Sequence, residues 1–248
     1  MTKTERKTVI ITGASRGIGR AMAERFAAHD YQVLVNYRYS KTSAEQLVAG
    51  LRSQGHSAEL FQADVASREE ATALLEYGFK QFGAVDVLIN NAGVAQTKLF
   101  TEISDGDWDE MIAVNLKGVF HCCQAALRYM LPRKSGKIIN ISSIWGISGA
   151  ACEVHYSAAK AGVIGLTKAL AKELGPSNIQ VNCIAPGIIA TEMLAGLAEN
   201  ELRELKEMTP LLRLGAPDDI AQTALFLAAE AANFITGQVI SPNGGFVI

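Results

Sequence analysis

The chain has 248 residues, of which 49% are hydrophobic, and 23 basic against 25 acidic side chains give a formal net charge of -2. This length is sufficient for one α/β domain with a sizeable core. The near-neutral balance excludes the strong basic excess that is typical of nucleic-acid-binding proteins, so we expect no nucleic-acid partner.

Strand-like and helix-like patterns alternate along the whole chain, and no linker interrupts them. We expect strands at residues 8–12, 32–36, 57–62, 85–90, 137–142, 180–185 and 238–241. Helices are expected at 18–28, 43–54, 68–82, 105–130 (ending before Pro132) and 154–174, with mostly helical chain before the last strand. This alternation predicts an α/β fold: a single Rossmann-type, doubly wound domain whose central parallel sheet has about seven strands.

The cysteines and the N-terminus carry no metal or targeting signal. Cys122, Cys123, Cys152 and Cys183 form no CxxC pair and have no histidine at metal-ligand spacing, so we expect reduced thiols and no bound metal. Residues 1–7 are polar and lead directly into an apolar strand, unlike a signal peptide. The apolar stretches are too short to cross a membrane. We therefore expect a soluble, cytoplasmic protein with no membrane partner.

The first strand is followed by the glycine-rich turn TGASRGIG at residues 12–19. Its glycines would allow backbone N–H groups and the next helix N-terminus to approach a pyrophosphate. The spacing is GxxxGxG rather than the GxGxxG dinucleotide fingerprint, and the turn could serve only close packing. The candidate cofactor contacts in this turn are Gly13, Ser15, Arg16, Ile18 and Gly19.

The second strand ends at Asn36-Tyr37-Arg38, without the acid that usually binds the ribose 2′-hydroxyl of NAD. Arg38, together with Arg16 and Ser15, could instead hold a 2′-phosphate through charge-assisted hydrogen bonds. The alternative is that Arg38 and Lys41 face solvent. The missing acid favours NADP(H) over NAD as the cofactor.

Two further candidate segments follow the third and fourth strands. The Asp64 carboxylate, beside Val65, could accept from an adenine amino group, or it could cap the helix near Ser67. The small residues after the fourth strand could lie against the adenosine ribose or form an ordinary turn. These residues are Asn91, Ala92 and Gly93.

Tyr156 and Lys160 are four residues apart on a predicted helix and share one face. A free phenol has a pKa near ~10, and a neighbouring ammonium can lower it, as can the oxidised nicotinamide ring. Ser143, after the fifth strand, could orient a substrate carbonyl. Asn115 is unfavourable inside a helix, so it could hold a water linked to Lys160 or mark a kink. Any of these can arise by chance, but their joint order after the right strands favours catalysis.

These residues closely resemble the short-chain dehydrogenase/reductase family over essentially the whole chain. The resemblance rests on residues 12–19, Asp64, 90–93, Asn115, Ser143, Tyr156, Lys160, Pro186 and Gly187. It implies one domain over 1–248, with a cofactor half at about 1–140 and a catalytic and substrate half at about 141–248. It also implies an NADP-dependent oxidoreductase acting on CH–OH groups, with the catalytic residues Asn115, Ser143, Tyr156 and Lys160. In the family, Tyr156 and Lys160 also contact the cofactor, and Pro186 and Gly187 precede the nicotinamide-binding stretch, which Ile189 and Thr191 fit here.

Within the family, the chain looks most like 3-oxoacyl-[acyl-carrier-protein] reductases of fatty acid biosynthesis, on the glycine-rich turn and segments 235–238 and 243–245. Residues 143–156 depart from that pattern and resemble a Gram-positive subgroup that reduces an aminopentanone group on a translation elongation factor. The resemblance implies a small or carrier-protein-bound carbonyl substrate. It also implies a homotetramer, in which the helices of Asn115 and Tyr156 form one interface and residues 246–248 another. A nucleotide-binding scaffold without catalysis is the alternative of another class, although Tyr156 and Lys160 are both present.

Two groups of residues could recognise the substrate. Trp145, Glu153 and His155 flank the catalytic pair and could line the substrate mouth, with packing as the alternative for Trp145 and His155. A basic cluster could dock an acidic acyl carrier protein or could be only a solvated face. Its members are Arg128, Arg133, Lys134, Lys137, Lys168 and Lys172.

Overall fold

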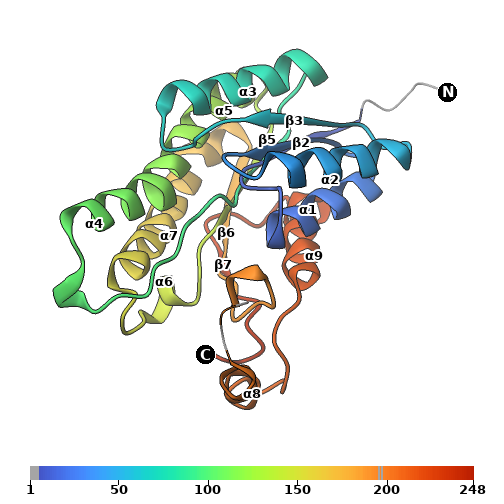
Figure 1. Cartoon of the computed structure of the whole chain (residues 1–248). Coiled ribbons are helices and arrows are strands. Elements are labelled where there is room, and N and C mark those ends of the chain that lie inside the picture. Colours follow the sequence, from blue (N-terminus) through green and yellow to red (C-terminus); the bar gives the residue numbers. More distant parts are fainter. Residues whose placement is uncertain (1–5, 195, 197) are drawn as a thin grey trace.

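The computed structural model describes residues 6–194, 196 and 198–248 (Figure 1). Seven parallel strands form one sheet in the order β3-β2-β1-β4-β5-β6-β7, which confirms the predicted α/β fold. Every predicted strand is present to within two residues at each end. The bounds are β1 Thr8–Ile11, β2 Gln32–Tyr37, β3 Ala58–Gln62, β4 Val87–Asn90, β5 Gly136–Ile141, β6 Ile179–Ile184 and β7 Val239–Ile240.

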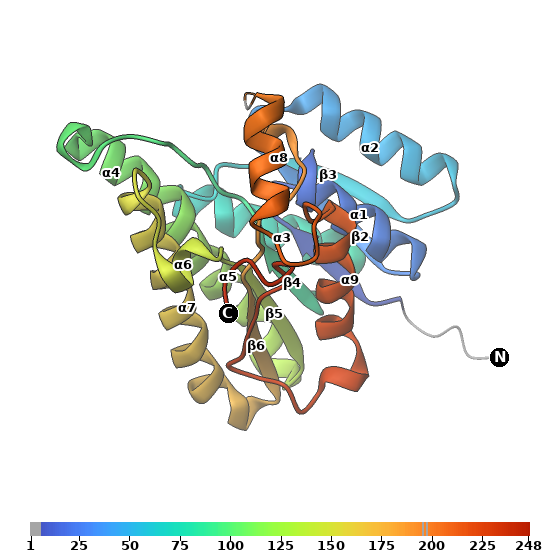
Figure 2. The same cartoon turned by 90° about the horizontal axis from the view of Figure 1, so that it is seen from below.

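Helices cover both faces of this sheet (Figure 2). Their bounds are α1 Gly17–Ala28, α2 Lys41–Ser53, α3 Arg68–Phe82, α4 Asp105–Ile112, α5 Gly118–Arg133, α6 Trp145–Ser148, α7 Val154–Leu174, α8 Glu199–Glu207 and α9 Pro217–Ala228. Short 3-10 turns are η1 Phe100–Glu102, η3 Gly175–Ser177, η4 Glu192–Leu194 and η5 Glu230–Ala232. Among the residues that the structure describes, none of the helices is long and apolar enough to span a bilayer.

The central strand β1 sends alternate side chains into two separate cores. Val9 and Ile11 pack with residues of α1, α2 and α9 on one face, where Phe26 is fully buried. Ile10 packs with residues of α3, α5 and α7 on the other face. A strand that is buried on both faces is the reason why the apolar run of β1 is continuous rather than alternating.

The predicted helix at 105–130 is divided in the structure. The π-helical turn η2 (Ala113–Lys117) lies between α4 and α5 and contains Asn115, so the irregularity suspected at this residue is present. Helix α5 continues through Pro132 to Arg133, so the prediction that it ends before Pro132 is wrong. A proline in the last turn removes only one backbone donor, and the helix ends where Lys134 takes a left-handed φ of 46°. Helix α6 was not predicted, because four residues carry no readable periodicity.

Strand register brings the candidate motifs to one edge of the sheet. Ile89 pairs with both Ile11 and Ile139, and Asn90 pairs with Asn140. The chain therefore leaves β1, β4 and β5 at the same level. The strand order reverses between β1 and β4, and in folds of this kind ligands bind at the carboxyl edge beside such a reversal.

Candidate active site

The glycine-rich turn fits tightly against the segment after β4. Gly13 has a φ of 61°, and a Cβ on it would lie 2.8 Å from the Cα of Ala92. A Cβ on Gly19 would lie 2.4 Å from the Gly13 carbonyl oxygen and 2.6 Å from Nδ2 of Asn91. Packing requires glycine at both positions, and the left-handed backbone of Gly13 favours glycine there as well. The turn and residues 91–92 therefore form one continuous backbone surface.

Asn91 and Asn36 hold this surface in place. Nδ2 of Asn91 donates to the carbonyls of Thr12 and Gly13 at 2.9 and 3.0 Å. Oδ1 of Asn36 accepts from the Gly13 N–H at 3.1 Å, and its Nδ2 donates to the carbonyl of Ala63 at 3.0 Å. Sequence reasoning missed this role of Asn36. The sequence does hold a clue to this role, because Asn36 is a polar residue within the apolar run of a mostly buried strand.

Helix α1 presents an open N-terminus beyond this turn. Arg16 provides no side-chain cap, and the first turn contains no acidic residue. Such a terminus attracts an anion, because its first N–H groups lack helical partners and the helix dipole is positive there. Together with the glycine surface, it fits the pyrophosphate of a dinucleotide. Ser15 is buried and Ile18 is half-buried beside it.

The two arginines expected near a 2′-phosphate are both paired with carboxylates. Arg38 lies 2.9 Å from Asp64, and Arg16 lies 3.2 Å from Glu192. Asp64 also accepts from the N–H of Ala66 at 3.0 Å. The cap of α3 is Ser67, which accepts from Glu70, so the capping alternative for Asp64 is wrong. Val65 is buried next to Asp64.

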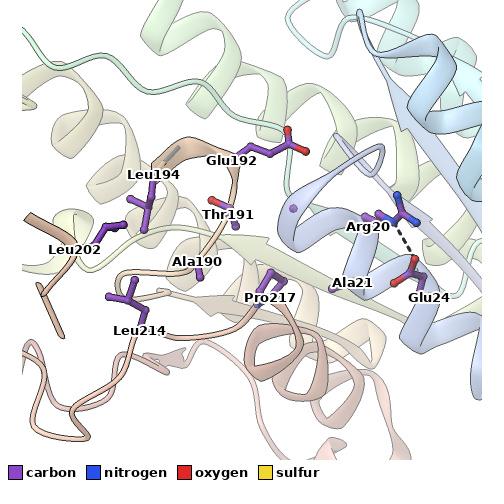
Figure 3. Close-up of a pocket in the computed structure, with 11 residues that line it drawn as sticks. Arg20, Ala21, Glu24, Ala190, Thr191, Glu192, Leu194, Leu202, Leu214 and Pro217 are labelled. Atoms are coloured by element: carbon purple, nitrogen blue, oxygen red, sulfur yellow. Dashed lines mark hydrogen bonds and ion pairs between the residues drawn. The ribbon is translucent and has the colours of Figure 1, made fainter. Parts of the chain in front are cut away.

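A cavity of about 570 Å³ lies between α1 and the chain around η4 (Figure 3). Gly17 and Thr191 both line it, so the expected nicotinamide-binding stretch faces the start of α1 across this cavity. Ile189 is buried, and Pro186 accepts from the N–H of Ile144 at 3.0 Å. A Cβ on Gly187 would lie 2.6 Å from the Asn243 backbone, so this glycine is required by packing.

The expected catalytic residues come together at the same carboxyl edge of the sheet. Nζ of Lys160 is 5.6 Å from the centre of the Tyr156 ring and donates to the Ile141 carbonyl at 2.9 Å. A Cβ on Gly93 would lie 2.7 Å from Oδ1 of Asn115 and 3.4 Å from Nζ of Lys160. Gly93 therefore adjoins both Asn115 and Lys160, and a side chain there would collide with the Asn115 amide.

Asn115 reaches the loop after β4 because the π turn displaces it from regular helical spacing. Its Oδ1 accepts from the Val94 N–H at 3.2 Å, and its Nδ2 donates to the Val94 carbonyl at 3.0 Å and the Met111 carbonyl at 3.1 Å. Both ends of the amide are thus engaged by backbone.

Ser143 is buried directly after β5, and its Oγ accepts from the N–H of Trp145 at 3.1 Å. This bond uses an acceptor position of the hydroxyl, which leaves the Ser143 proton available for another oxygen. Trp145 itself packs edge-on against Phe246, with ring centres 5.8 Å apart.

Burial drives both members of the Tyr156–Lys160 pair toward their neutral forms. Desolvation raises the pKa of Tyr156 to about 12, with a further contribution from Glu153 and an opposing one from Ser143. Desolvation also lowers the pKa of Lys160 to about 8. The sequence suggested that the ammonium lowers the pKa of Tyr156. In the protein without its cofactor that prediction is wrong, because burial is the largest influence on the pKa of Tyr156 and the opposing influence comes from Ser143.

His155 does not line the substrate mouth. It is fully buried, and its Nε2 lies 2.9 Å from Oε1 of Gln96 in the loop after β4. Packing, the alternative given for this residue, is therefore correct. Glu153 is half-buried at the start of α7 and close enough to Tyr156 to affect its pKa.

The model of the short chain dehydrogenase family matches residues 7–202. The chain belongs to this family. It is 44% identical over 239 residues to the 3-oxoacyl-[acyl-carrier-protein] reductase FabG of Staphylococcus aureus, covering 96% of this chain and 97% of that one. It is 43% identical over 249 residues to the 3-oxoacyl-[acyl-carrier-protein] reductase of Synechocystis sp., covering 100% of both. A crystal structure of a putative gluconate dehydrogenase from Agrobacterium tumefaciens superposes with a TM-score of 0.93 at 36% identity, covering 98% of this chain and 97% of that one.

The basic cluster lies away from the expected catalytic residues of this short chain dehydrogenase. Arg133 and Lys134 precede the amino end of β5, whereas Ser143 follows its carboxyl end. Lys172 is sixteen residues beyond Tyr156 on α7, roughly 24 Å along the axis at 1.5 Å per residue. Within one chain, the cluster is at the wrong edge of the sheet for the docking that the sequence suggested.

Proposed function

We propose that this short chain dehydrogenase is an NADPH-dependent carbonyl reductase that converts 3-oxoacyl-[acyl-carrier-protein] to 3-hydroxyacyl-[acyl-carrier-protein] in fatty acid synthesis. The observation that carries the reaction is the grouping of Tyr156, Lys160 and Asn115 around Gly93 at the carboxyl edge. The names of the relatives that are 41 to 44% identical support the substrate.

The cofactor residues fit NADPH. The open N-terminus of α1 suits the pyrophosphate, and Arg16 and Arg38 suit a 2′-phosphate. Lys160 uses one N–H on Ile141, so two remain to hold the nicotinamide ribose. When bound, the reduced nicotinamide supplies a hydride to the carbonyl carbon.

The protein supplies the proton and the orientation. Ser143 donates a hydrogen bond to the carbonyl oxygen and holds it beside Tyr156. Tyr156, whose raised pKa keeps it protonated at neutral pH, gives its proton to the same oxygen. The phenolate that results is stabilised by Lys160 while that residue is charged, and Lys160 can return a proton because its pKa is about 8. We assign Asn115 the role of holding the water that refills this relay, through the acceptor position on Oδ1 that the bond from Val94 leaves open.

A second candidate substrate is a ketone that carries an amine, such as an aminopentanone group on a translation elongation factor. Glu153 favours it. This half-buried carboxylate stands three residues before Tyr156, and no hydrogen-bond or ion-pair partner for it is found among the described residues. A cationic substituent would pair with it, whereas an acyl chain would not. Glu153→Gln should then lower kcat/KM for an amino ketone and leave that for a 3-oxoacyl thioester unchanged.

We also propose a homotetramer. Trp108 on α4 and Phe120 on α5 are partly exposed, and Phe234 and Ile248 near the C-terminus are fully exposed in the single chain. Apolar side chains gathered at the two expected interfaces would be covered by association. Light scattering should give four times the chain mass, and a monomer would contradict this assignment.

The experiment that tests the substrate compares kcat/KM for acetoacetyl-carrier protein, acetoacetyl-CoA and a small free ketone, with NADPH consumption as the readout. The proposal requires the carrier-bound substrate to be the best of the three. Equal kcat/KM values for the three substrates would indicate a general ketone reductase. NADPH binding without turnover of any of the three would indicate the non-catalytic scaffold.

A further inference from the structure

The catalytic tyrosine stands in the first turn of α7, which has weak local support. Tyr156 is the third residue of this helix, and its N-cap residue Glu153 makes no side-chain capping bond. First-turn N–H groups have no partners within their own helix, so helix ends open readily. Something outside α7 must therefore hold the phenol in place.

His155 makes the bond that can do this. It is the neighbour of Tyr156 and is fully buried, and its Nε2 meets Oε1 of Gln96 at 2.9 Å. Gln96 in turn donates from Nε2 to Oδ1 of Asp107, the third residue of α4, at 2.9 Å. Gln96 therefore bridges the first turns of two helices.

Asp107 fixes the direction of this chain of hydrogen bonds. It also accepts from Lys98 Nζ at 2.7 Å and from the Ser104 N–H at 2.9 Å, and these donors hold the pKa of its carboxyl well below the usual range. An ionised carboxylate only accepts, so the amide nitrogen of Gln96 faces Asp107. The Gln96 oxygen then faces His155, whose Nε2 must carry the proton.

The same loop is anchored on both sides of Gln96. Val94 is held by Asn115 through two hydrogen bonds, and the Lys98 N–H donates to the Cys152 carbonyl at 2.7 Å. The loop begins at Gly93, which adjoins Lys160. The loop is thus hydrogen-bonded along its length, from its start beside Lys160 to its contact with the turn that precedes Tyr156.

We propose that Gln96 and His155 are positioning residues that lock the first turn of α7 to the loop after β4 and so hold the Tyr156 phenol in register with Ser143. The inference rests on the proposed reductase function. Neither residue touches the reacting atoms in this account, because His155 is enclosed between α7 and the loop. Their bond should matter for the chemical step and little for cofactor binding.

The test uses His155→Leu and Gln96→Leu, assayed with NADPH and a small activated ketone ester. Each should lower kcat about tenfold to hundredfold, because a displacement of ~1 Å can cost ~10²-fold, while KM for NADPH stays within about twofold. The double variant should lose no more than Gln96→Leu alone, because both single variants remove the His155–Gln96 bond and only Gln96→Leu also removes the bond to Asp107. His155→Gln, whose amide can still donate, should recover part of the loss.

The matched control is Thr167→Val on the same helix. Thr167 is also fully buried, and it donates to Val163 at 2.8 Å and accepts from Asn140 at 2.9 Å, but it lies three turns away from Tyr156. This variant should lower Tm and leave kcat unchanged. Equal loss of kcat in the control, additive losses in the double variant, or wild-type kcat in the leucine variants would each overturn the proposal.

Hydrogen exchange of residues 150–160 tests positioning without catalysis. Exchange in the first turn of α7 should accelerate in the His155 and Gln96 variants and not in Thr167→Val. If the leucine variants fail to fold, Gln96→Asn takes their place, because it only shortens the side chain by one methylene. It should lower kcat and accelerate hydrogen exchange in the first turn of α7. If the variants show faster exchange but the wild-type protein reduces no ketone, the proposed reductase function is wrong. If exchange in the variants is unchanged, the positioning role is wrong.

Discussion

The guanidinium of Arg38 lies 2.9 Å from the carboxylate of Asp64, between the ends of the paired strands β2 and β3. It also stacks on the ring of Tyr39, 4.5 Å from the ring centre. Arg38 is thereby held at the place where a 2′-phosphate is expected, but part of its charge is already neutralised. Arg16 is neutralised in the same way by Glu192. The 2′-phosphate of NADPH must compete with both carboxylates for these arginines, which should weaken the preference for NADPH over NADH.

Arg38→Asp should shift the cofactor preference from NADPH toward NADH. The substitution removes a phosphate partner and places a second carboxylate beside Asp64, so it repels the 2′-phosphate. The measurement is the ratio of kcat/KM for the two cofactors. Lys168→Asp, the same charge change at an exposed position far down α7, should leave the ratio unchanged. A wild type that uses NADH as well as NADPH would refute the assignment.

Glu192→Gln should lower KM for NADPH by about two- to fivefold at low salt, because it releases Arg16 for the phosphate. The effect is small because both side chains are largely exposed, and such pairs are worth ~0–1 kcal/mol. It should fade at high ionic strength. Glu76→Gln removes a comparable exposed partner, from Lys80 on α3, and serves as the control. A rise in KM would show that Glu192 assists binding instead of competing.

Tyr156→Phe should keep NADPH binding and lose ~10²–10⁴-fold in kcat, the usual contribution of a positioned general acid. The phenyl ring preserves the packing around Lys160, so Tm should change little. Cofactor fluorescence measures binding and NADPH consumption measures turnover. Turnover near the wild-type rate would exclude Tyr156 as the acid.

Stability should rise with pH through Lys160. Its pKa is about 8 in the folded protein against an ordinary value of 10.5, so below pH 8 the buried ammonium carries its full desolvation cost. Between about pH 8 and 10.5 the folded state binds fewer protons than the unfolded state, and this cost is relieved. The difference between the two pKa values corresponds to ~3 kcal/mol.

Lys160→Met removes this cost at every pH. The gap in unfolding free energy between the variant and the wild type should therefore narrow by about 2 kcal/mol between about pH 7 and 9.5 in urea titrations. Tyr156 has the opposite dependence, since its pKa is raised, but this acts only above its ordinary value of 10. A gap that stays constant with pH would mean that Lys160 is not desolvated.

The sheet and the grouping of the expected catalytic residues could be predicted from sequence because each depends on local pattern. The apolar runs mark the strands, and parallel strands place whatever follows them at one edge, so Ser143 and Gly93 had to meet near Tyr156. The four-residue spacing of Tyr156 and Lys160 likewise needs only a helix.

The parts that could not be predicted depend on contacts between distant segments. The Arg16–Glu192 ion pair joins residues that are 176 positions apart in the sequence, so no local pattern predicts it. Burial set the pKa of Tyr156, and the amount of burial follows from tertiary packing rather than from its neighbour at Lys160. His155 could be judged exposed or packed only once the loop carrying Gln96 was placed.

The reaction that we propose for this chain is hydride transfer from NADPH to a carbonyl carbon, with a proton supplied by the protein. Its most direct test is a reaction of the purified protein with acetoacetyl-carrier protein and NADPH that carries deuterium at both C4 positions. We expect a 3-hydroxyacyl product with one deuterium on the carbinol carbon and one NADPH consumed per product, at a rate that falls ~10²–10⁴-fold in Tyr156→Phe. A protein that binds the cofactor yet forms no deuterated alcohol, from this ketone or from a free one, would contradict it.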